Sequence, residues 1–136
     1  MIEQIEIVLP EMKRGFHLIT SSIEKNLKNL PEKGLLNLFL QHTSAAIAIN
    51  ENADPSVRYD FNTFIDHLIP DGNHLFTHRL EGNDDMPAHI KSSLFGQSLI
   101  IPIKNHRLAL GTWQGIYLCE FRDYGGSRRI LATILE

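Results

Sequence analysis

The chain has 136 residues, of which 43% are hydrophobic and 21% are charged, and its formal net charge is −3 at pH 7. This length and composition predict one folded domain, residues 1–136, and exclude a disordered chain. Because 13 Lys and Arg face 16 Asp and Glu, no basic surplus is available for phosphate backbones, and nucleic acid is not an expected partner. No apolar run approaches the roughly 20 residues that cross a bilayer, and no leader pattern is recognisable, so we expect no membrane association and a cytoplasmic protein.

The first half of the chain predicts strands and two amphipathic helices. Ser21 and Glu24 have the spacing of a capping box and are expected to begin a short helix. Asp54 and Pro55 are typical of the first residues of a second helix, whose apolar stripe ends at Leu68. Alternating or continuous apolar runs predict strands over residues 2–9, 35–40 and 45–50.

The second half begins with a polar loop of unusual length, from about residue 70 to residue 87, which suggests a function beyond connection. A third helix is expected over 87–95, before Gly96. Glycines in the segment 123–126 favour a hairpin between the last two strands. Short connections favour antiparallel pairing, so the predicted fold is α+β, a β-rich sandwich of mostly antiparallel strands with two to three short helices. The predicted strands of this half are 99–103, 107–110, 115–122 and 129–135.

Histidine supplies the candidate metal ligands. Of seven histidines, His42, His78 and His89 stand beside polar or glycine-containing segments. Three imidazoles with one open position are a recurrent arrangement of catalytic zinc, and other divalent metals also accept this donor. The long spacing leaves ordinary hydrogen-bonded histidines as the alternative.

Acidic residues gather just before the third predicted helix. Glu81, Asp84 and Asp85 could orient a metal-bound histidine, bind magnesium or act as a base. The alternative is a solvated turn that caps the helix.

Arginines and the single tryptophan are the candidate ligand-binding groups. Arg122 and Arg128 flank the glycines of the predicted hairpin, where planar guanidinium groups could hold a phosphate bidentately, or could simply form a charged surface. Trp113 lies between small residues and could stack on a planar ligand, or could anchor a core or subunit interface. Cys119 lies in an apolar run, which favours a buried structural thiol.

Six ordered motifs resemble the YjbQ-like family, the secondary thiamine-phosphate synthase enzymes, and the resemblance extends from about residue 16 to the C-terminus. Several motifs in a matching order are more specific than any one of them. They are Gln41 to Ala46, Asn50 to Asn52 with Asp54-Pro55, His78 with Glu81-Gly82, Asp84 to Lys91, Leu110 to Ile116, and Gly125 to Arg129.

The resemblance implies a homotrimer whose site contains several histidines suited to a metal and an anionic ligand. It also implies an activity, the joining of hydroxymethylpyrimidine diphosphate and thiazole phosphate, which we expect to be weak. The expected cofactor is a divalent metal, zinc or, with a diphosphate substrate, magnesium. The expected site combines metal ligands His42, His78 and His89 with catalytic Glu81, Asp85 and Glu120, and substrate-binding Thr43, Asn50, Trp113, Gln114, Arg122 and Arg128.

Two alternatives remain open from the sequence. A metal with an open position could activate water against a phosphorylated small molecule, which would make the protein a metal-dependent phosphate-ester hydrolase. The protein could instead be a trimeric metabolite-binding protein without turnover. In each case the expected partner is a phosphorylated small molecule.

Overall fold

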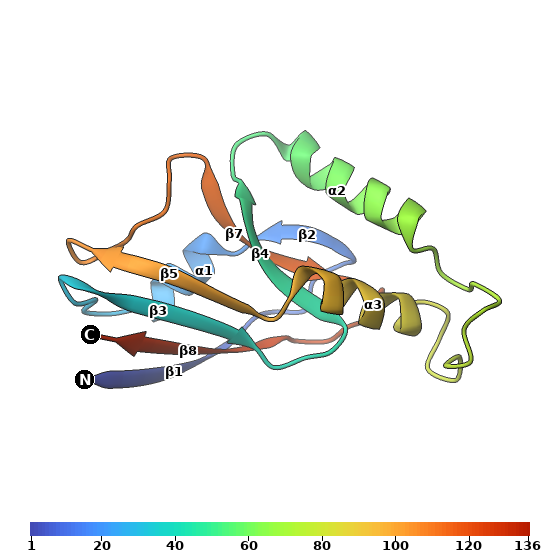
Figure 1. Cartoon of the computed structure of the whole chain (residues 1–136), viewed down its shortest axis with the longest axis horizontal. Helices are drawn as coiled ribbons and strands as arrows, with labels where there is room; N and C mark the ends of the chain where they lie inside the picture. Colours follow the sequence, from blue (N-terminus) through green and yellow to red (C-terminus); the bar gives the residue numbers. More distant parts are fainter.

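The computed structural model describes residues 1–136 and contains two β-sheets and three helices (Figure 1). Strands follow the order β1-β8-β3-β5-β6 in the five-stranded sheet and β2-β7-β4 in the three-stranded sheet. All strand pairs are antiparallel, which confirms the predicted α+β class. The helices are α1 (Thr20–Asn26), α2 (Pro55–Leu68) and α3 (Asp85–Phe95). The strands are β1 (Ile2–Val8), β2 (Gly15–Leu18), β3 (Lys33–Leu40), β4 (Ala45–Glu51), β5 (Ser98–Lys104), β6 (Arg107–Leu108), β7 (Gln114–Glu120) and β8 (Arg129–Leu135).

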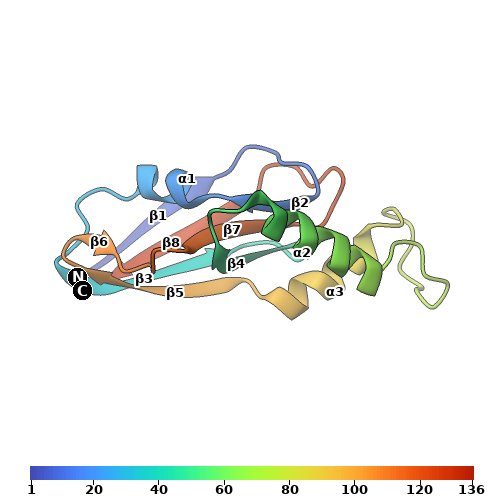
Figure 2. The ribbon, with the colours of Figure 1, turned by 90° about the horizontal axis from the view of Figure 1, so that it is seen from above.

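The two sheets pack face to face, and their inner faces form the main core (Figure 2). Alternate residues of β3, such as Leu36 and Leu38, lie fully buried against Ile47 of β4 and Leu118 of β7. The other face of the three-stranded sheet is covered by α2 and α3, which form a second, aromatic cluster around Phe16. Strand β7 therefore lies in the middle of three layers, and its residues 115–120 are all buried. No helix of the structure is both long and apolar enough to span a bilayer.

The outer face of the five-stranded sheet carries no helix (Figure 2), and several large apolar side chains are exposed on it. Register places Leu35 beside Leu135, which in turn faces Ile2, while Phe39 lies opposite Leu131. We call the exposed residues Ile2, Leu35, Phe39, Ile100 and Leu135 the outer patch; they are 40–66% exposed.

Two local predictions are wrong. Segment 123–126 does not form a hairpin, because β7 and β8 belong to different sheets and residues 121–128 cross between them. Helix α1 begins at Thr20 with no side-chain cap, and the Thr20 hydroxyl instead accepts the N–H of Ile116 at 2.9 Å. Helix α2 is present as predicted, and its apolar stripe is only partly covered, since Phe64 is 66% exposed.

Two other local predictions are confirmed. Asp54 caps α2 by accepting the N–H of Ser56 at 2.9 Å. Cys119 is fully buried, and burial raises the pKa of its thiol, as expected for a structural cysteine.

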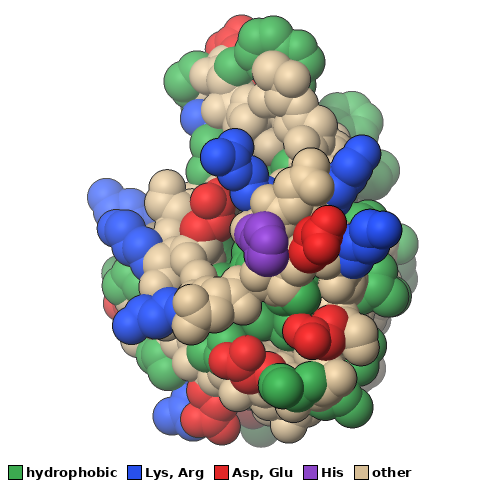
Figure 3. Space-filling model, turned by 90° about the vertical axis from the view of Figure 1, so that its left-hand side faces the viewer, with side chains coloured by type: hydrophobic (Ala, Val, Ile, Leu, Met, Phe, Trp, Pro, Cys, Tyr) green, Lys and Arg blue, Asp and Glu red, His purple; other side chains and the backbone are tan.

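The two ends of the molecule differ in character. The N- and C-termini lie together at one end, and the loop between α2 and α3 projects at the other (Figure 1). At the end with the termini, acidic and basic side chains are interspersed (Figure 3). The candidate metal ligands gather where α3 and the projecting loop meet.

Candidate metal centre

Helix α3 presents two candidate ligands from its first turns. Asp85 and His89 are four residues apart, so they lie on the same face of the helix. The loop before α3 brings His78 to the same place, and one nitrogen or oxygen of each residue lies within 4.8 Å of the others. The Asp85 side chain is 2% exposed, against 43% for His78 and 30% for His89. A buried carboxylate therefore contacts two imidazoles that reach the surface.

Both imidazoles converge on one carboxylate oxygen. Oδ2 of Asp85 lies 2.7 Å from Nε2 of His78 and 3.0 Å from Nε2 of His89. Nδ1 of His89 donates to the carbonyl oxygen of Thr43 at 2.8 Å, so this nitrogen carries the proton. In the neutral ring, Nε2 of His89 then has no proton, and its lone pair faces a carboxylate oxygen. Such a pair of acceptors requires a cation, either a second imidazole proton or a metal ion.

The second oxygen of Asp85 is held from behind. Oδ1 accepts Nη1 of Arg122 at 2.5 Å. Burial opposes ionisation of Asp85, but the hydrogen bond from His78 and the positive charge of Arg122 favour the charged form, and the pKa of the carboxyl is lowered. The carboxylate is therefore charged at neutral pH, as a metal ligand must be.

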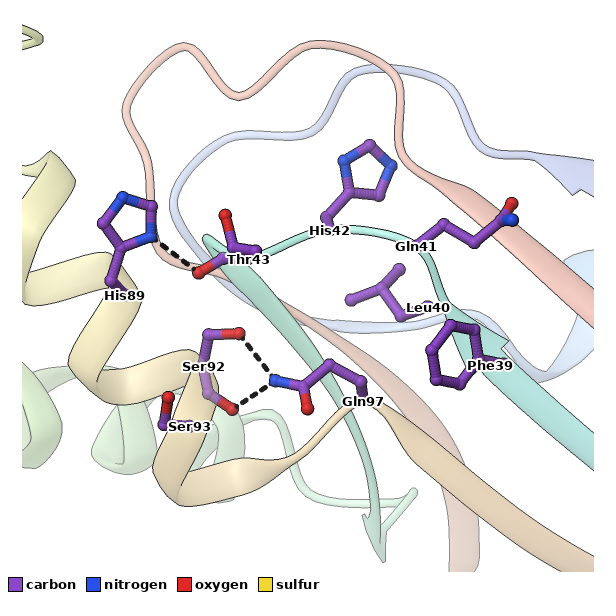
Figure 4. A pocket seen from close by; sticks show the side chains of 9 residues that line it. All are labelled: Phe39, Leu40, Gln41, His42, Thr43, His89, Ser92, Ser93 and Gln97. Carbon is purple, nitrogen blue, oxygen red and sulfur yellow. Dashed lines mark hydrogen bonds between the residues drawn. The ribbon is translucent and has the colours of Figure 1, made fainter.

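A cavity of about 680 Å³ lies beside His89, between α3 and the end of β3 (Figure 4). Its wall is fixed by hydrogen bonds: Ser92 donates to the carbonyl oxygen of Ala45 at 2.7 Å, and Gln97 donates to Ser92 at 2.9 Å. No acidic, lysine or arginine side chain lines it. The lining residues are Phe39, Leu40, Gln41, His42, Thr43, His89, Ser92, Ser93 and Gln97.

His42 lines this cavity but does not join the metal cluster, which corrects the predicted three-histidine site. Its Nε2 accepts the backbone N–H of Arg129 at 2.8 Å, and its Nδ1 lies 3.4 Å from Nη1 of Arg128. Both nitrogens therefore face other groups. Burial and the neighbouring Arg128 charge lower the pKa of His42, so the ring is neutral at pH 7.

Glu120 and Arg128 form a buried ion pair with each other and are not part of the metal cluster. Nε and Nη2 of Arg128 donate to the two oxygens of Glu120 at 2.8 and 2.5 Å, and Nη2 also reaches the carbonyl oxygen of Ser44 at 3.2 Å. Glu120 is 0% exposed and Arg128 is 3% exposed. The expected catalytic role of Glu120 and anion-binding role of Arg128 are corrected, because each group is the other's partner.

The predicted residues Asn50, Trp113 and Gln114 lie at the opposite end of the three-stranded sheet. Asn50 pairs with Gly115 near the start of β7, whereas the cluster lies beyond the paired residues Ala45 and Glu120. Trp113 is 65% exposed, and Gln114 accepts the N–H of Gly111 at 2.8 Å. Within one chain these three residues do not share a site with the histidines.

The whole fold is shared with proteins of known sequence and structure. UPF0047 protein YjbQ of Escherichia coli O157:H7 is 50% identical over 133 residues, and that of Salmonella typhimurium is 53% identical over 133 residues, in each case over 96% of both chains. The crystal structure of a conserved hypothetical protein from Thermus thermophilus superposes with a TM-score of 0.83 at 34% identity, over 94% of this chain and 97% of that one. The model of the family UPF0047 protein YjbQ-like matches residues 4–136. The chain belongs to the YjbQ-like family.

In this YjbQ-like protein the donor set fits a divalent metal. Two imidazole nitrogens and one carboxylate oxygen are the ligand types of zinc, and two histidines with one carboxylate also bind other divalent transition metals. The Nδ1–H of His89 bonded to a carbonyl oxygen is the usual orientation of a metal-binding histidine. Glu81 stands at the edge, 65% exposed, with its carboxylate 3.8 Å from Nε2 of His78.

One ligand had a recognisable signal in the sequence. Asp85 and His89 have the i, i+4 spacing of a shared helical face, which makes Asp85 a candidate ligand as well as a candidate supporting carboxylate. Ser92 and Gln97 of the cavity wall carry no such signal, since their role depends on the way α3 packs against β4.

Asp84 makes the folded protein sensitive to acid. Burial raises the pKa of its carboxyl, but bonds from the N–H of Asp123 at 2.9 Å and from Nε of Arg122 at 3.0 Å lower it below the ordinary value of 3.8. The folded state therefore binds this proton more weakly than the unfolded chain, and stability falls as pH drops below about 4. Thermal unfolding between pH 6 and pH 3 should show a shallower acid loss in Asp84→Asn than in the wild type. The exposed Asp60→Asn should retain the wild-type slope.

Proposed function

We propose that this protein is a divalent-metal-dependent enzyme that acts on phosphorylated small molecules, with His78, Asp85 and His89 as the metal ligands and zinc as the metal. The observation that supports the proposal most directly is the convergence of two imidazole nitrogens on one buried carboxylate oxygen. A lone pair of His89 faces that oxygen, so a cation completes the arrangement. The adjoining cavity gives the proposed centre a place for a substrate.

When bound, the metal would supply a Lewis acid for a phosphoryl oxygen or for water. The residues of the chain hold and orient the reactants. The cavity beside His89 receives the organic part of the substrate through the hydroxyl of Thr43 and the amide of Gln97. Glu81, exposed and 3.8 Å from His78, is the proposed proton acceptor.

Two reactions are compatible with this centre. The joining of hydroxymethylpyrimidine diphosphate and thiazole phosphate needs charge neutralisation on a leaving diphosphate. Hydrolysis of a phosphate ester needs only an activated water and one bound phosphoryl group. No lysine or arginine lines the cavity, and Arg122 and Arg128 are bonded to carboxylates. Few cations are therefore available to neutralise a leaving diphosphate, and this observation supports hydrolysis as the second candidate reaction.

The experiment that tests the proposal joins metal analysis to product detection. Purified protein is expected to hold about one zinc per chain. It should form product from the two heterocyclic phosphates or release phosphate from a panel of phosphate monoesters. A chelator should abolish either activity, and zinc should restore it.

The product separates the candidates, because only the transferase reaction joins the two heterocycles. If metal-bound protein binds these ligands but forms no product, the result would support a metabolite-binding protein without turnover. Activity that is unchanged after the chelator has removed all metal would contradict the metal-dependent function.

We also propose that the protein is a homotrimer, as the family resemblance implies. The outer patch supports this, since exposed apolar side chains on an uncovered sheet face are of the kind that subunits bury against one another. Light scattering at micromolar concentration should give the mass of three 15.5 kDa chains.

The variant Ile100→Asp should shift this mass toward one chain. Leu75→Asp, at a 74% exposed leucine of the projecting loop, is the matched control and should leave the assembly intact. Dissociation by Leu75→Asp alone would move the interface to the loop, and a wild-type mass of one chain would exclude the trimer.

A further inference from the structure

Arg122 was predicted from the sequence to bind phosphate. In the structure its guanidinium instead forms hydrogen bonds within the protein. Its Nη1 donates to Oδ1 of Asp85 at 2.5 Å, and its Nε donates to Oδ2 of Asp84 at 3.0 Å. Its Nη2 donates to the carbonyl oxygen of Glu81 at 2.9 Å. With its side chain 21% exposed and all three nitrogens bonded, the group has little freedom to bind a ligand.

We propose that Arg122 is the positioning residue of the metal centre, an inference that rests on the proposed function. A carboxylate offers two equivalent oxygens, and either could turn toward the histidines. The bond from Arg122 fixes Oδ1 on the inner side, so Oδ2 faces His78 and His89. The planar fork of arginine suits this task, because it makes separate bonds at fixed angles.

Arg122 also holds the segment that leads from His78 to α3. The carbonyl of Glu81 and the carboxylate of Asp84 belong to this segment, and both accept from the same guanidinium. One side chain therefore fixes Asp85 and limits the position of the loop that carries His78. The distance between the two imidazoles depends on this loop.

Gly82 permits the close approach of the loop. Its φ is +112°, a conformation that L side chains rarely adopt, and a Cβ there would lie 2.9 Å from Oδ1 of Asp84. The same Cβ would lie 3.9 Å from Nη2 of Arg122. The backbone is thus shaped to bring the Glu81 carbonyl and Asp84 onto the guanidinium.

Arg122 is itself anchored from the sheet. It directly follows Phe121, which is 1% exposed, and its backbone N–H donates to Oε2 of the buried Glu120 at 3.2 Å. The end of β7 therefore places the guanidinium, and the guanidinium places Asp85. This is the arrangement by which groups behind the ligands orient them.

The test measures zinc affinity by chelator competition on full-length Arg122→Gln and Arg122→Lys, with the visible absorption of the cobalt-substituted protein as a second measurement. Arg122→Gln should bind zinc about 10–100-fold more weakly, the usual effect of removing a group that orients a metal ligand. Arg122→Lys keeps the charge but not the fork, and should recover only part of the affinity. The cobalt absorption band should change in both variants, because it reports ligand geometry and not stability.

Arg14→Gln is the matched control. Arg14 is 16% exposed and bridges Asp66, Asp71 and Asp123, but it contacts no metal ligand. Its substitution should lower the thermal stability of the metal-free protein without changing zinc affinity or the cobalt spectrum. If Arg122→Gln does not fold, Arg122→Lys decides the test alone. Wild-type zinc affinity and cobalt spectrum in the folded variants would overturn the positioning role, whereas a wild type that binds no zinc would overturn the metal function as well.

Discussion

Replacing Asp85 with asparagine is expected to weaken zinc binding by about 100-fold or more, a loss of roughly 3 kcal/mol. Asparagine keeps the shape of the side chain but removes the charge that faces both imidazoles at 2.7 and 3.0 Å. His89→Ala and His78→Ala should lose metal to a similar degree, since each removes one of the three proposed ligands. Elemental analysis and chelator competition measure the effect, and any zinc-dependent activity should fall with it.

Two other histidines distinguish this site from the three-histidine site predicted from the sequence. His42→Ala should retain metal, because both ring nitrogens of His42 face other groups. The exposed His67→Ala on α2 is the second control. Loss of metal in His42→Ala with retention in Asp85→Asn would restore the sequence-based set of ligands and exclude the one described here.

Breaking the Glu120–Arg128 pair is expected to destabilise the protein by about 3–5 kcal/mol, the usual effect of leaving one buried charge without its partner. Glu120→Ala does this because Arg128 is 3% exposed and cannot reach water. Urea unfolding at a fixed protomer concentration measures the change, since an oligomer's stability depends on concentration.

The comparison with a second ion-paired arginine separates burial from charge. Arg14→Ala should cost no more than about 1 kcal/mol, because the carboxylate partners of Arg14 are 34–57% exposed. The double variant Glu120→Leu with Arg128→Met should recover much of the stability lost in Glu120→Ala, since no unpaired charge remains. An equal loss in Arg14→Ala and Glu120→Ala would contradict this account.

The sequence was sufficient for those features that local chemistry dictates. The cap formed by Asp54 and the buried thiol of Cys119 follow from neighbouring residues alone. The crossing after β7 was not predictable in this way. The glycines at 125 and 126 permit a hairpin, but the pairing of β8 with β1 and β3 decides the path of the chain.

In the candidate site, too, some features follow from neighbouring residues and others depend on contacts distant in sequence. His78 and His89 were predicted as ligands and do lie together, because His89 is on α3 and His78 is in the loop that leads into this helix. His42 has a similar polar context, yet the backbone of Arg129, distant in sequence, occupies its Nε2. Such a contact depends on the packing of β8 and has no signature among the residues near His42.

The position of β8 has a consequence for synthesis of the protein on the ribosome. This strand is the last in chain order, yet it lies between β1 and β3 and provides the only partner of β1. In a nascent chain that ends before Arg128, the strands β1 and β3 have no strand between them, and Glu120 has no ion-pair partner. The five-stranded sheet can therefore close only after β8 has been synthesised, since this strand completes the pairing that reaches from Ile2 to Leu135. Until then the edges of β1 and β3 that β8 will join are unpaired, which leaves the incomplete chain open to pairing with other strands.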